Sequence, residues 1–207
     1  MDIDLVFDDV RARLIATRAI QDRYKAKWIW PEASIADWDA ALVALDAARD
    51  AYSDSVAGQQ DARAALKSVA DSLHTESRQV LGIAKVDFRN APAKLAGFAP
   101  LQAQGASVPK TLATAQSVSS AWQKADPAWV PIPGKTLTSY DATRADVTRK
   151  QVALANATAT ARETNRTLRN LLSTQDKQSK AWYAVATRVF LATTPEGDAI
   201  RTEIRSA

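Results

Sequence analysis

The stretch WDAALVALDAARDAY, residues 38–52, decides the fold that we predict for this chain. Trp38, Leu45 and Tyr52 recur in it at intervals of seven residues, and alanine fills many of the positions between them. Alanine is the strongest helix former, and a sustained seven-residue repeat is typical of helices that pack along a shared seam. The stretch therefore predicts a helix with one buried edge.

This seven-residue series continues far beyond residue 52. Its members are Trp38, Leu45, Tyr52, Gln59, Leu66, Leu73 and Val80. We expect the helix to begin at Ser34, whose hydroxyl can cap free backbone amides in a capping box with Asp37, three residues on. We expect it to stop before Pro92. A helix of some 55 residues would be about 80 Å long at 1.5 Å per residue, which predicts a rod-like molecule.

A second series repeats the first one 102 residues later. Its members are Tyr140, Val147, Leu154, Ala161, Leu168, Gln175, Trp182 and Val189. The shift also places Phe88 on Phe190, and a proline follows each long segment, at Pro92 and Pro195. We interpret this as an internal duplication with quasi-repeats at about 1–101 and 102–207, each holding a short helix, a tryptophan-proline turn and a long helix. Chance alignment of alanine-rich heptads is the alternative.

The remaining segments complete an all-α prediction for a chain with few strand signals. Short helices are expected at about 3–28 and 110–125, and a connection rich in proline and glycine at about 91–109. The expected fold is a single elongated domain over residues 1–207, a coiled-coil-like bundle of two long and two short helices. The sequence leaves open whether the long helices run parallel or antiparallel. The layout resembles uncharacterised bacterial helical-bundle proteins with two similar halves, a resemblance that implies no function.

Charge is distributed unevenly along the chain, whose formal net charge is +4. Residues 34–90 hold nine acidic and six basic residues, whereas residues 138–190 hold nine basic and four acidic ones. Opposite charge on two long segments could be internal complementarity, could guide head-to-tail association, or could be incidental charge on solvated helix faces.

Catalytic, cofactor and metal sites are not predicted. The chain has no cysteine and a single histidine, His74, which lacks the companion ligands of a metal site. The Gly134-Lys135-Thr136 sequence lacks the preceding glycine and strand of a phosphate-binding loop, so we assign it to a turn and a helix cap. We therefore expect a protein that is not an enzyme.

Two groups of residues are candidates for interaction. The turns WIWPEAS, residues 28–34, and PAWVPIPG, residues 127–134, carry tryptophans that could be buried plugs or exposed anchors, and the tail holds two isolated isoleucines. This possible interaction surface comprises Trp28, Trp30, Trp129, Ile200 and Ile204. A possible polyanion-binding face comprises Arg144, Arg149, Arg162, Arg166, Arg169, Lys177 and Lys180.

The function expected from these features is structural. We predict a scaffolding protein that self-assembles as a homo-oligomer, or packs with another protein into a larger bacterial or phage assembly. The alternative is a polyanion-binding helical module, with nucleic acid as the partner, that uses the basic face of residues 144–180. No window is apolar enough to span a membrane and no signal peptide opens the chain, so a cytoplasmic location is the default expectation.

Overall fold

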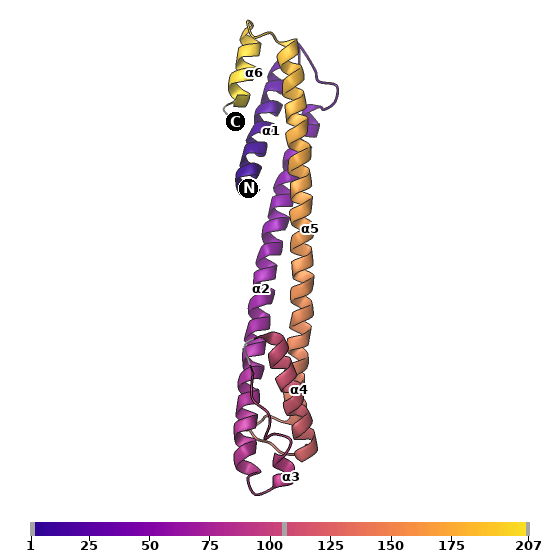
Figure 1. The fold of residues 1–207 in the computed structure, drawn as a ribbon. Helices are drawn as coiled ribbons and strands as arrows, with labels where there is room; N and C mark the ends of the chain where they lie inside the picture. Colours follow the sequence, from indigo (N-terminus) through magenta and orange to yellow (C-terminus); the bar gives the residue numbers. More distant parts are fainter. Residues whose placement is uncertain (1–2, 105–106, 206–207) are drawn as a thin grey trace. The chain divides into compact units, whose positions relative to one another are not determined.

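The computed structural model describes residues 3–104 and 107–205, and these residues form helices and no strand (Figure 1). The elements are α1 (Ile3–Tyr24), α2 (Ile35–Asp87), α3 (Pro92–Leu95), α4 (Val108–Ala125), α5 (Leu137–Val189) and α6 (Pro195–Arg205). The all-α prediction with two long helices is confirmed. The structure adds α3 and α6 to the two long and two short helices that the sequence predicted.

The chain forms two compact units, each containing part of both long helices. The first unit comprises Met1–Val56 and Thr160–Ala207, and the second comprises Ala57–Ala159. In the first unit, α1, the beginning of α2, the end of α5 and the short α6 lie side by side (Figure 1). The second unit holds the end of α2, the beginning of α5, α3 and α4.

The two long helices correspond in length and position. Each contains 53 residues, and both of their boundaries differ by the 102 residues of the sequence shift. The duplication and the rod-like shape nevertheless stay predictions, because equal helices can also arise without a duplication.

Hydroxyl side chains fix the beginnings of both long helices. Ser34 and Asp37 form the expected capping box, because the Ser34 backbone N–H donates to the Asp37 carboxylate at 2.7 Å and the Asp37 N–H donates to Ser34 Oγ at 3.2 Å. Before α5, the Ser139 N–H donates to Thr136 Oγ1 at 3.2 Å. Gly134 has a φ of +76°, the left-handed conformation in which glycine is unstrained.

The core of the first unit lies along the predicted seam. Trp38 and Leu45 of α2 are fully buried, and so are Leu14 of α1 and Trp182 of α5. The indole Nε1 of Trp38 donates to Gln21 Oε1 at 2.8 Å, which satisfies a polar group that would otherwise destabilise a buried ring. The two seven-residue series thus contained Trp38, Leu45 and Trp182, which the long helices bury in this unit.

The core of the second unit combines aromatic and aliphatic side chains. Trp122 of α4, Phe98 after α3 and Tyr140 of α5 are fully buried. The hydroxyls of Tyr140 and Ser77 are 2.7 Å apart and share a hydrogen bond between α5 and α2. Burial raises the pKa of Tyr140 well above its ordinary value, because the phenolate would be poorly solvated there.

Several boundaries differ from the sequence-based expectation. The first helix ends at Tyr24 rather than near residue 28, and α4 begins at Val108 rather than at residue 110. The connection expected at 91–109 contains α3, whose first residue is Pro92, a position where proline suits a helix start. Residues 105 and 106 of that connection lie outside the described residues.

Candidate interaction surfaces

The helices of the first unit carry different net charges. Helix α1 holds four acidic and four basic residues, so it is neutral. Within this unit, α2 holds five acidic residues and one basic residue, whereas α5 holds six basic and two acidic ones. The net charges are therefore −4 for this part of α2 and +4 for this part of α5.

Helix α1 supplies partners for some of these charges. Arg11 pairs with Asp46 of α2 at 2.8 Å, and Arg18 pairs with Asp39 at 2.9 Å. The hydrogen bond from the Arg11 guanidinium holds the pKa of the Asp46 carboxyl below its usual value. On α5, the carboxylate of Asp176 accepts hydrogen bonds from Arg13 of α1 and from Lys180.

The contacts between α2 and α5 are neutral, in contrast. In the first unit, the hydroxyls of Ser55 and Thr164 are 2.7 Å apart. Within residues 3–104 and 107–205, no ion pair joins α2 to α5. The opposite charges that the sequence places on the two long helices are thus not paired directly with each other inside the described structure.

An acidic face remains on the outer side of α2. Val43, Asp50 and Asp54 fall within about 40° on a helix with 100° per residue, on the side opposite the half-buried Tyr52. Val43 is 70% exposed, and both aspartates are exposed. Neither aspartate has an ion-pair partner among the described residues. We call Val43, Asp50 and Asp54 the acidic face.

A basic row runs along the outer side of α5 in the first unit. On a helix with 100° per residue, its members occupy an arc of about 80°. They are Arg162, Arg166, Arg169, Ser173, Lys177 and Lys180. Arg169 donates from Nε to Asn165 at 2.8 Å. The charged ends of Arg162, Arg166 and Lys177 have no ion-pair partner within the part of the chain that the structure describes. We call these six residues the basic row.

Two arginines of the predicted polyanion face belong to the second unit instead. Arg144 lies 3.4 Å from Asp141 and also contacts Gln116, and Arg149 pairs with Asp146 at 3.0 Å. These local partners partly neutralise both side chains. The structure therefore brings five of the seven predicted basic residues together in one unit.

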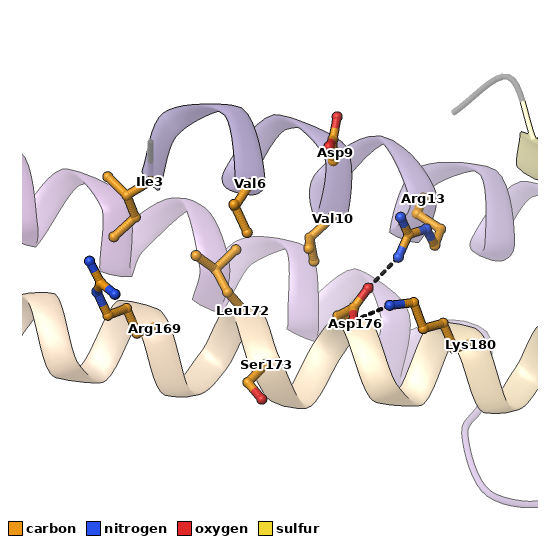
Figure 2. Close-up of a pocket in the computed structure, with 10 residues that line it drawn as sticks. All are labelled: Ile3, Val6, Asp9, Val10, Arg13, Arg169, Leu172, Ser173, Asp176 and Lys180. Atoms are coloured by element: carbon orange, nitrogen blue, oxygen red, sulfur yellow. Dashed lines mark hydrogen bonds and ion pairs between the residues drawn. The ribbon is translucent and has the colours of Figure 1, made fainter. Parts of the chain in front are cut away.

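A groove of about 460 Å³ lies between α1 and α5 beside the basic row (Figure 2). Its apolar lining includes Val6, Val10 and Leu172, and the side chains of Val6 and Leu172 point toward each other across it. The charged lining includes Arg13, Arg169, Asp176 and Lys180. With Asp9 included, the lining of the groove carries three basic and two acidic side chains beside its apolar residues.

The second unit has a groove at corresponding positions. Lys67, Ala70 and Asp71 of α2 line it, together with the beginning of α4. Shifting these three residues by 102 gives Arg169, Leu172 and Ser173, which line the groove of the first unit. In both units a groove thus opens where the beginning of the short helix packs against a long one.

The tryptophans of the first turn pack within their unit. Trp30 is 3% exposed and stacks on Trp38 with ring centroids 5.7 Å apart. Trp28 is half-buried and lies 6.1 Å from Trp182 and from Phe190. Both rings therefore have the environment that a plug of the turn needs.

Trp129 occupies the same kind of position in the second unit. Its ring is half-buried, 4.7 Å from that of Phe88 and 5.5 Å from that of Trp122. Its indole Nε1 donates to Asp87 at 3.0 Å, which ties the turn before α5 to the end of α2.

The tail packs on the first unit through α6. Ile200 is fully buried, whereas Ile204 is half-buried. Arg23 of α1 pairs with Glu203 at 2.5 Å, and Lys27 pairs with Glu196. At the turns, the apolar residues that are exposed are Ile29, at 66%, and Val130, at 51%, which the sequence analysis missed. Which of several adjacent apolar side chains points outward depends on the conformation of the turn and not on residue type.

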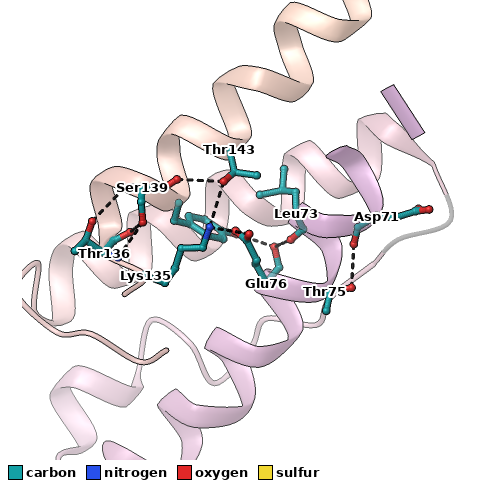
Figure 3. Close-up of polar contacts among 10 residues, drawn as sticks. Asp71, Leu73, Thr75, Glu76, Lys135, Thr136, Ser139 and Thr143 are labelled. Atoms are coloured by element: carbon teal, nitrogen blue, oxygen red, sulfur yellow. Dashed lines mark hydrogen bonds and ion pairs between the residues drawn. The ribbon is translucent and has the colours of Figure 1, made fainter. Parts of the chain in front are cut away.

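The Gly134-Lys135-Thr136 turn has a structural role in the second unit (Figure 3). Lys135 pairs with Glu76 of α2 at 2.7 Å, and both side chains are mostly buried. Its ammonium group also donates to Thr143 at 3.4 Å. The lysine thus holds the start of α5 against α2, and Thr136 caps that helix, in agreement with the turn and cap expected from the sequence.

These features define the chain as an all-α helical-bundle protein whose two long helices have charged, exposed faces. Within the described residues, no helix is long and apolar enough to cross a membrane, and no group of three or more potential ligands could hold a metal ion. Comparison with family models, with curated proteins and with solved structures finds no match.

Proposed function

We propose that this protein is a non-enzymatic structural protein that self-associates, or packs into a larger assembly, through the opposite charges of α2 and α5 in the first unit. The observation that carries the proposal is the absence of any ion pair between these two helices within the described residues, although their net charges here are −4 and +4. Helix α1 pairs some of these charges, but the two aspartates of the acidic face have no ion-pair partner within the described residues, and neither do Arg162, Arg166 and Lys177 of the basic row. These charges are therefore available to a second copy.

The energetics favour an association that needs several contacts at once. An exposed ion pair contributes about 0.2 to 1 kcal/mol, so a single pair cannot hold two molecules together. Asp50 and Asp54 on one side, and Arg162 and Arg166 on the other, provide such a set. Complementary potentials also raise the rate of encounter and disfavour the wrong orientation.

Light scattering across protein concentration and salt tests this proposal. We expect oligomers in low salt that dissociate at about 0.5 M salt, where the Debye length falls to about 4 Å. The variant D50K/D54K should stay monomeric in low salt, because its α2 face repels the basic row. The proposal would be refuted if the wild-type protein is monomeric under every condition and no partner copurifies with it from cells.

Polyanion binding is the second candidate, and the basic row is the observation that favours it. Five cationic side chains occupy one arc of α5 over about 27 Å, at 1.5 Å per residue. A strand of phosphates could follow such a row, and the affinity would fall steeply with salt. No aromatic side chain interrupts the row to stack on bases, which places this function second.

The two candidates respond differently to substitutions in α2. The variant D50K/D54K removes the acidic face and leaves the basic row intact, so it should lose self-association and keep any nucleic-acid binding. Filter binding with single-stranded DNA and RNA in low salt provides the measurement. Absence of salt-sensitive retention of either nucleic acid would eliminate the second candidate.

A further inference from the structure

The acidic face and the basic row have matching spacings along their helices. On α2, Asp50 lies seven residues and Asp54 eleven residues after Val43. These intervals correspond to about 10 Å and 16 Å along the helix. Asp39 lies four residues before Val43, on the same side of the helix, although its carboxylate already pairs with Arg18.

The basic row shows the same intervals in the opposite direction. Arg166 lies seven residues and Arg162 eleven residues before Ser173, and Lys177 lies four residues after it. Ser173 is the uncharged member of the row and is exposed at the edge of the groove that Leu172 lines. An aliphatic side chain can therefore approach the row at Ser173 without meeting a positive charge.

We propose that α2 of one copy docks antiparallel on α5 of a second copy, with Val43 facing Ser173. This inference rests on the proposed self-association and specifies its register. In that register every acidic residue of the face meets a basic residue, and Val43 meets Ser173, the uncharged member of the row. The facing pairs are Asp39–Lys177, Val43–Ser173, Asp50–Arg166 and Asp54–Arg162.

Charge complementarity indicates that the partner bound to the basic row is a second copy of this chain. The basic row needs a partner helix with carboxylates at intervals of eleven and four residues, and Asp39, Asp50 and Asp54 on the outer side of α2 provide them. The row itself is unsuited to pairing with its own copy, because like charges would face each other.

The proposed contact also determines the kind of assembly. The two surfaces lie on different helices of the first unit, each on the side turned away from the seam between them. A molecule that uses its acidic face on one neighbour keeps its basic row for another. Such a contact is heterologous, so it forms open chains or closed rings rather than isolated twofold dimers.

Cysteine cross-linking tests the register directly, because the chain contains no cysteine. The variants V43C and S173C are made separately, mixed in low salt and oxidised. Both positions are exposed, so neither substitution disturbs the core. We expect a mixed disulfide-linked dimer with a yield about tenfold above that of a V43C and V152C mixture, because docking raises the effective concentration of the two thiols.

The control position and the salt dependence separate specific from random oxidation. Val152 is 57% exposed and lies outside the basic row. The yield with V152C therefore measures disulfide formation by random collision. The V43C–S173C product should decrease at about 0.5 M salt, whereas random products should not. Circular dichroism confirms that each variant retains its helices.

The outcomes distinguish this inference from the proposed function. Light scattering that shows oligomers, together with cross-linking no better than the Val152 control, would overturn the register and leave self-association in place. Preferential V43C–V43C or S173C–S173C products would overturn it too, since they require a twofold contact. A monomer in every condition would remove both the register and the proposed function.

Discussion

At the scale of the residue, Trp30 links the turn between α1 and α2 to the core. Its ring is 3% exposed and stacks on Trp38. We expect the variant W30A to lose about 3 to 5 kcal/mol of unfolding free energy, the usual cost of removing a large buried ring. Its association, measured by light scattering under native conditions, should not change. Reduced association with an unchanged urea midpoint would instead identify Trp30 as an anchor.

Burial of Tyr140 is expected to lower the stability of the protein as the pH rises above 10. Its pKa is raised in the folded state because of burial, while the unfolded chain releases the proton at the ordinary value near 10. The unfolded state therefore binds fewer protons above pH 10, and stability falls as the pH rises. The variant Y140F should unfold with a weaker pH dependence above pH 10, as urea titrations at several pH values would show. Equal slopes for both proteins would contradict this assignment.

The sequence predicted residue environments where one element determines them. Ser34 and Thr136 cap helices through neighbours three residues away, so local spacing was sufficient. The pairing of Asp46 with Arg11 was not predictable, because it depends on how α1 is rotated against α2. For the same reason the sequence could not show that Ile29, rather than Trp30, would be exposed.

At the scale of the element, α6 is held by the buried Ile200, by two ion pairs and by a hydrogen bond of 3.2 Å from Arg201 to the Thr187 carbonyl of α5. Ile200 is fully buried, and the pairs join α6 to Arg23 and Lys27. The variant I200A should lose about 2 to 5 kcal/mol and expose the amides of α6 to hydrogen exchange. The variant I29A is the matched control, since Ile29 is 66% exposed. Protection of α6 that is equal in both variants would show that Ile200 does not hold it.

The predictability of the elements followed their length. The 53-residue helices repeat their buried positions many times, so the heptad pattern identified them and their approximate ends. Helix α3 has only four residues, which is too short for any periodicity. Helix α6 carries Ile200 and Ile204 among charges, and its burial depends on α1 rather than on a pattern of its own.

At the scale of the whole molecule, the charge separation between the long helices is the central feature of the proposal. The opposite net charges were visible in the sequence, and so were the basic residues at helical intervals. The groove beside the basic row was not predictable, because it depends on the packing of α1 against α5. The charged residues that lack an ion-pair partner were not predictable either, because the pairing depends on how the helices pack.

A mixing experiment with charge-reversed variants tests the central claim most directly. In D50K/D54K the two lysines face Arg162 and Arg166, and in R162E/R166E the two glutamates face Asp50 and Asp54. Like charges then meet at these positions, so each variant alone should remain monomeric in low salt. Mixed in equal amounts, they present complementary surfaces again and should form oligomers that dissociate at about 0.5 M salt. Oligomers that light scattering detects only in the mixture would support self-association through α2 and α5. Oligomers of either variant alone, or a mixture that stays monomeric, would contradict it.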